Sequence, residues 1–88
     1  SRGYRELTQK LVRTANDVCS GRLMMCHEGG YNAPTVPYFG LVVLEELSGT
    51  ETPVDDPFGA ILEGLGGQDL QPHQDAVVKQ AEALLQVL

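Results

Sequence analysis

The sequence is poor in cysteine, basic residues and long apolar runs, and each shortage excludes a class of protein. Two cysteines, Cys19 and Cys26, are too few for the disulfide framework of a small secreted domain. Six Lys and Arg residues do not form the basic cluster that a nucleic-acid surface needs. No signal peptide or transmembrane run is present. We therefore expect a cytoplasmic protein with reduced thiols that binds neither nucleic acid nor membrane.

Length and charge set further limits. Eighty-eight residues suit one small domain of marginal stability, because a chain of this size buries a smaller share of its unfolded surface than a larger domain does. The formal net charge of −6 is explained by ordinary solubility. An attraction for cationic substrates such as polyamines is a weaker alternative.

Apolar residues at three- and four-residue spacing predict helices over residues 4–19, 36–47, 56–64 and 72–87. The stripe of the first helix consists of Tyr4, Leu7, Leu11, Ala15, Val18 and Cys19. The second helix is so rich in apolar residues that we expect it to be buried nearly all round.

Glycine, proline and short polar residues mark where these helices begin and end. Gly21 suits a left-handed cap after the first helix. Thr35 is the expected N-cap of the second helix, with Pro37 in its first turn. Asp56 is the expected N-cap of the third helix, followed by Pro57.

Residues 23–26 are apolar without alternation, which predicts that residues 22–26 form a strand buried on both faces in a parallel sheet. A helix that leads into such a strand is half of a β-α-β unit, and no earlier strand is present in the chain. An unpaired strand leaves its backbone unsatisfied. We therefore expect residues 23–26 to pair with another chain or with the remainder of a longer protein.

The loop over residues 28–34 follows this strand and contains Gly29, Gly30 and Tyr31. Paired glycines allow positive φ or a close approach of another group. Tyr31 would therefore lie at the carboxyl end of a strand, where α/β sheets place their ligands. The structural alternative is a turn with a half-buried tyrosine that only packs.

Several stretches together resemble the C-terminal part of the zinc-dependent histone deacetylase and acetylpolyamine amidohydrolase family, in its class II and bacterial form. The resemblance lies in Gly3-Tyr4-Arg5-Glu6-Leu7-Thr8, Ala15, Gly21-Arg22-Leu23, Glu28-Gly29-Gly30-Tyr31-Asn32, Asp56-Pro57-Phe58 and Pro72-His73-Gln74. It implies a fragment of an arginase/deacetylase-type three-layer α/β/α sandwich. This α/β fragment would be mostly helical, with about four helices and one buried parallel-type strand.

The resemblance also implies a chemistry. Tyr31 would donate a hydrogen bond to the tetrahedral oxyanion formed from an acetyl-lysine or acetylpolyamine amide, and Gly29 and Gly30 would line the substrate pocket. Glu28 is better explained as a structural carboxylate. The zinc ligands of the family lie upstream of the matching stretch. The resemblance therefore implies zinc in the longer protein, no metal ligand in this chain, and an inactive fragment.

Other residues that bind metals elsewhere do not form a pattern here. The spacing of Cys19, Cys26, His27 and His73 does not match the usual zinc patterns, and buried thiols are the simpler explanation for the cysteines. Asp56-Pro57 resembles an aspartate-containing zinc motif of the family, but it follows Tyr31 where the motif precedes it. The alternative function is a non-catalytic helical module for assembly or regulation, which the amphipathic helices support equally well.

Overall fold

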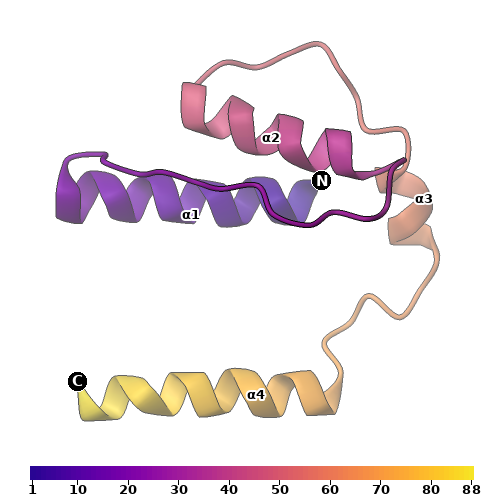
Figure 1. Ribbon diagram of the computed structural model, residues 1–88. Coiled ribbons are helices and arrows are strands. Elements are labelled where there is room, and N and C mark those ends of the chain that lie inside the picture. The colour runs from indigo at the N-terminus through magenta and orange to yellow at the C-terminus, as the bar shows by residue number, and fades with distance from the viewer.

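The computed structural model describes residues 1–88 and contains helices joined by extended segments. The elements are α1 (Arg2–Cys19), α2 (Val36–Ser48), α3 (Gly59–Gly64), α4 (Pro72–Ala83) and the 3₁₀ turn η1 (Leu84–Val87). Helices α1 and α2 pack against each other, and the extended segment after α1 returns along that helix before α2 begins (Figure 1). Helix α4 lies apart from this pair. None of the helices is both long and apolar enough to cross a lipid bilayer.

The predicted α/β sandwich fragment is wrong, because the fold is all-helical and has no strand or sheet. Residues 22–26 are extended but make no ladder, and Met24 is 85% exposed. A β-strand needs a neighbouring strand to receive its backbone hydrogen bonds, and this chain supplies none. The apolar run therefore indicated a segment that needs cover, without defining its secondary structure.

The helices occupy the regions that the apolar spacing indicated, with shifted ends. Helix α1 was predicted over 4–19 and spans Arg2–Cys19, and α2 was predicted over 36–47 and spans Val36–Ser48. Helix α3 was predicted over 56–64 and spans Gly59–Gly64. The last helix was predicted over 72–87, where α4 covers Pro72–Ala83 and η1 follows it. Helix α4 begins with a capping box in which the Gln74 side chain accepts a hydrogen bond from the Gln71 backbone N–H (2.8 Å).

The caps differ in detail from those expected. Ser20 (φ 55°) and Gly21 (φ 76°) are both left-handed after α1. Thr35 is the N-cap residue of α2, but its side chain makes no capping bond. Asp56 does not cap α3, which begins after Phe58. It accepts a hydrogen bond from the Phe58 N–H (2.9 Å) and so caps the turn before the helix.

Helix α1 packs with a different face from the one that carries its large apolar residues. Its least exposed residues are Arg5, Thr8, Val12, Ala15 and Cys19. The larger residues of the predicted stripe stay open, with exposures of 53% for Tyr4, 55% for Leu7, 39% for Leu11 and 75% for Val18. At 100° per residue the two stripes lie about 90° apart on the helix. We call the exposed one the open stripe of α1.

Helix α2 is also covered on one side only, contrary to the expectation of burial all round. Val42 and Glu45 are buried, whereas Leu44 is 63% exposed. The ring of Phe39 stacks on Tyr4 of α1 with centroids 4.9 Å apart. Tyr38 meets Phe58 edge-on at 6.0 Å, which ties α2 to the start of α3.

The hydrophobic core is small for a chain of this length. Ala15 and Val42 are its only buried apolar residues. The radius of gyration is 15.6 Å, against about 12 Å for a compact chain of 88 residues. The accessible surface is 7289 Å², against about 5,000 Å² for a compact monomer of this mass. Much apolar surface, including Leu7 and Val18 of the open stripe and both valines of α4, is therefore left exposed.

This uncovered surface predicts that the isolated chain associates. We expect concentration-dependent sedimentation at physiological salt and strong binding of the dye ANS, because apolar patches larger than a few hundred Å² rarely stay free in water. Replacing Leu7 and Leu11 by Gln should reduce both signals, whereas Lys10→Gln on the same helix should not. A chain that sediments as a monomer and binds no dye would contradict this expectation.

Candidate functional site

The loop that carries Tyr31 has an unusual backbone. Gly29 (φ 73°) and Gly30 (φ 90°) both adopt positive φ, a region that residues with a Cβ rarely occupy. The side chain of Tyr31 directly after them is 99% exposed. The chain passes through these two left-handed glycines into a fully exposed tyrosine, whose hydroxyl is open to an external acceptor.

The two glycines differ in how closely they are packed. A Cβ on Gly30 would lie 3.0 Å from Cγ2 of Val36 and 3.2 Å from Nε2 of His27. A Cβ on Gly29 would meet only the ring of Tyr31, at 3.7 Å. Gly30 is therefore required for space as well as for backbone conformation, and it seats the loop against the first turn of α2.

A groove of about 450 Å³ lies beside this loop, between residues 25–30 and α2. Its apolar wall is formed by Tyr4, Met25, Val36, Phe39, Val43, Leu44 and Leu47. His27, Glu28 and Gly30 supply polar atoms. Of the predicted site residues, the groove brings in Gly30, while Tyr31 and Gly29 are not part of its lining.

No group of three or more His, Cys, Asp or Glu side chains lies close enough together to hold a metal ion. Cys26, His27 and Glu28 line the groove as neighbours in sequence, but Cys19 and His73 lie elsewhere. The resemblance places the zinc ligands upstream of the matching stretch.

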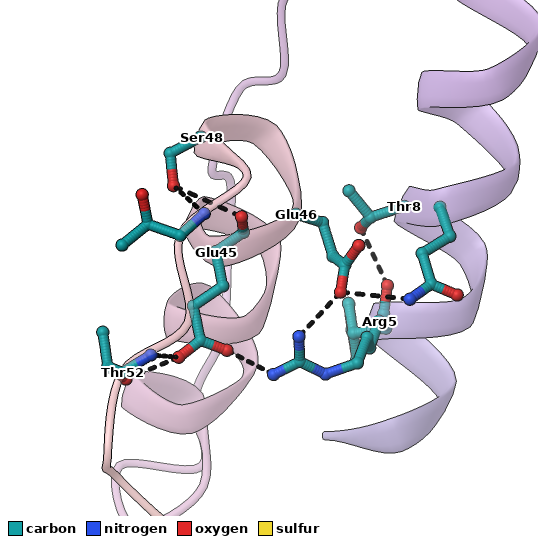
Figure 2. Close-up of polar contacts among 9 residues, drawn as sticks. Arg5, Thr8, Glu45, Glu46, Ser48 and Thr52 are labelled. Atoms are coloured by element: carbon teal, nitrogen blue, oxygen red, sulfur yellow. Dashed lines mark hydrogen bonds and ion pairs between the residues drawn. The ribbon is translucent and has the colours of Figure 1, made fainter.

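A polar cluster joins α1 to α2 and was not predicted from the sequence. The Arg5 guanidinium donates to Glu45 and also to Glu46 (2.6 Å), and the backbone N–H of Thr52 donates to Glu45 (2.9 Å) (Figure 2). We call Arg5, Glu45, Glu46 and Thr52 the Arg5 clamp. Its signal in the sequence was a pair of glutamates inside an otherwise apolar helix.

The contacts of the clamp favour the charged forms of Glu45 and Arg5. Hydrogen bonds from the Thr52 hydroxyl, the Arg5 guanidinium and the Thr52 backbone N–H lower the pKa of Glu45 to about 2. The hydrogen bonds to Glu45 and Glu46 raise the pKa of Arg5, which stays cationic. Glu45 is only 6% exposed, so its charge depends on these partners.

Comparison with known proteins finds a bacterial relative that matches most of this chain. The chain is 41% identical over 63 residues to the histone deacetylase-like amidohydrolase of Pseudomonas aeruginosa, a match that covers 72% of this chain and 17% of that protein. No family model matches the chain. No solved structure matches it either. The match supports the histone deacetylase-like amidohydrolase family, and the chain spans about a sixth of the length of this relative.

The stability of the chain should depend on pH through Glu45. Because the pKa of Glu45 falls from 4.5 to about 2 on folding, the unfolded state binds a proton first as the pH is lowered. The stabilisation is therefore complete above about pH 4.5 and disappears as the pH falls towards 2. Urea titrations followed by circular dichroism between pH 7 and 2 should show this loss.

Glu45→Gln should weaken folding at pH 7 and flatten the pH dependence between 4.5 and 2. Glu51→Gln, which changes an exposed carboxylate in the loop after α2, is the matched control and should leave the curve unchanged. An unaltered curve for Glu45→Gln would show that the clamp does not stabilise the fold.

Gly30→Ala should disturb the loop more than Gly29→Ala. Both substitutions impose positive φ on alanine, which costs about 1–2 kcal/mol, but only the first also pushes against Val36 and His27. The amide chemical shifts of His27 and Val36, and the ring shifts of His27, should move in Gly30→Ala. They should stay close to wild type in Gly29→Ala. Equal changes in the two variants would contradict the packing argued for Gly30.

Proposed function

We propose that this chain is the Tyr31-bearing part of a longer, zinc-dependent, class II-like amidohydrolase that removes acetyl groups from acetyl-lysine or acetylpolyamine amides. The observation that carries the proposal is the 41% identity over 63 residues to a histone deacetylase-like amidohydrolase. The chain itself has no group of side chains that could hold a metal. The proposed zinc is therefore held by residues outside these 88, and the chain alone is expected to be inactive.

Tyr31 supplies an oxyanion donor in this proposal. Hydrolysis of an amide passes through a tetrahedral intermediate whose oxygen carries a negative charge. A phenol O–H is a donor that stays neutral near pH 7. The exposure of the Tyr31 side chain supports this role, because its hydroxyl is free to reach a substrate carbonyl. The donor strengthens its hydrogen bond as the charge develops, which favours the intermediate over the ground state.

Gly29 and Gly30 line the substrate pocket beside Tyr31 in the same proposal. Positive φ at both residues supports it, because the absence of a Cβ lets a ligand approach the backbone closely. Glu28 keeps a structural role at the start of the turn.

Other parts of the longer protein, or another chain, would cover the exposed apolar segments. Residues 23–26 are the first candidates, since Met24 is 85% exposed and no part of this chain covers it. The alternative function, a helical module for assembly or regulation, is favoured by the same exposed surface. The two proposals differ in whether the Tyr31 hydroxyl matters for turnover.

The test is deacetylation of an acetyl-lysine peptide and an acetylpolyamine by the longer protein, wild type against Tyr31→Phe. We expect kcat to fall by about 10²–10³-fold, because that is the usual effect of removing one oxyanion donor. Zinc content, measured by mass spectrometry, should not change. Tyr38→Phe is the matched control, since Tyr38 packs edge-on against Phe58 and its hydroxyl should not affect turnover.

Unchanged turnover in Tyr31→Phe would contradict the proposed role and leave Tyr31 as a surface residue. A longer protein that deacetylates neither substrate would favour the assembly module. If the 88-residue chain bound zinc stoichiometrically by itself, the placement of the metal ligands outside this chain would be wrong.

A further inference from the structure

The hydrogen bonds of the segment that bears the Tyr31 loop lie at its two ends. At the first end the Arg22 N–H donates to the Cys19 carbonyl (3.3 Å), and at the second the Asn32 carbonyl accepts from the N–H groups of Thr35 and Val36 (3.1 and 3.0 Å). Residues 23–31 between them make no hydrogen bond to either helix. Their position is therefore set by where α1 ends, where α2 begins, and the contact of Gly30 with Val36.

The relative position of α1 and α2 in turn depends on polar contacts. Ala15 and Val42 are the only buried apolar residues of the two helices, so apolar burial alone fixes their packing weakly. Arg5 bridges Glu45 and Glu46, and Gln9 adds a hydrogen bond to Glu46 (3.1 Å). Arg5 is thus the centre of the polar contact between the helices, with Glu45 almost fully withdrawn from water.

Arg5 is adjacent in sequence to a residue that lines the groove beside the loop. Tyr4, the neighbour of Arg5, stacks on Phe39 of α2 and shares the groove with His27 and Gly30. A shift of the first turns of α1 would therefore move the wall of the groove on which the loop rests.

We propose that Arg5 is a positioning residue for Tyr31. By bridging Glu45 and Glu46 it holds the first turns of α1 against α2, and this fixes Gly30 and the direction in which Tyr31 leaves the loop. The inference rests on the proposed oxyanion role of Tyr31. Arg5 itself touches no substrate and changes no bond.

A double-mutant cycle in the longer protein tests this. Arg5→Met keeps much of the side-chain length and removes the bridge, Arg5→Lys keeps the charge and loses the two-pronged geometry, and each is combined with Tyr31→Phe. Arg13→Met is the matched control, because this guanidinium on the same helix donates only to the Gln9 carbonyl. Thermal melting reports the folded fraction of each variant.

We expect Arg5→Met to lower kcat by about 10- to 100-fold with little change in KM, the size of effect that a misplacement of about 1 Å produces. Arg5→Lys should recover part of the loss. In the Tyr31→Phe background Arg5→Met should have almost no further effect, because a residue that acts through Tyr31 has nothing left to position. Arg13→Met should match wild type.

The outcomes separate the two proposals. If Tyr31→Phe loses activity but Arg5→Met has no effect, or an equal effect in both backgrounds, the positioning role of Arg5 is overturned and the proposed function stands. If Tyr31→Phe keeps full activity, the proposed function is overturned, and the positioning role that rests on it is overturned as well. Should Arg5→Met not fold, Glu46→Gln replaces it as a milder break of the same clamp, and the same absence of additivity is required.

Discussion

The contact between α1 and α2 is the constraint on which the rest of the structure depends, and a charged cluster dominates it. A buried ion pair gives little net stability compared with apolar packing, but breaking one partner leaves an uncompensated charge. The Arg5 clamp therefore specifies an arrangement more than it strengthens one. Small residues at the contact, Thr8 and Ala15, let the helices approach closely enough for Arg5 to reach Glu45 and Glu46.

This arrangement explains why the Tyr31 loop has a defined place without hydrogen bonds of its own. The segment before it returns along α1 and is fixed where it enters α2 (Figure 1). Gly30 can approach Val36 because it has no Cβ, and its positive φ turns the chain outwards at Tyr31. The position of the exposed tyrosine thus depends on the two glycines before it and on the contact between the helices. Arg5, which bridges the helices in this contact, lies 26 residues before Tyr31.

The features that sequence analysis could predict are those decided by neighbours in the chain. Apolar spacing, Gly21 and Pro72 place the helices, since helix ends respond to local backbone preferences. The glycine turn before Tyr31 is local in the same way. The strand over residues 22–26 could not be decided locally, because an apolar run forms a strand only when another strand receives its hydrogen bonds. The Arg5 clamp was missed because Arg5 and Glu45 lie 40 residues apart.

The apolar pattern of α1 shows a related limit of sequence reasoning. The spacing of Tyr4, Leu7, Leu11 and Val18 predicted a face of the helix that packs against a partner. Within this chain the helix buries its small residues against α2 and leaves the stripe open. Helix α4 and residues 23–26 are open in the same way. An amphipathic pattern specifies that a face has a partner, and the partner can lie outside the chain that carries the pattern.

The proposed function also requires residues outside this chain, since an oxyanion donor becomes catalytic only beside a group that activates water. Under the proposed function, the open apolar surfaces and the separation of Tyr31 from the zinc ligands share one explanation, a longer protein in which these surfaces meet the residues that complete the site.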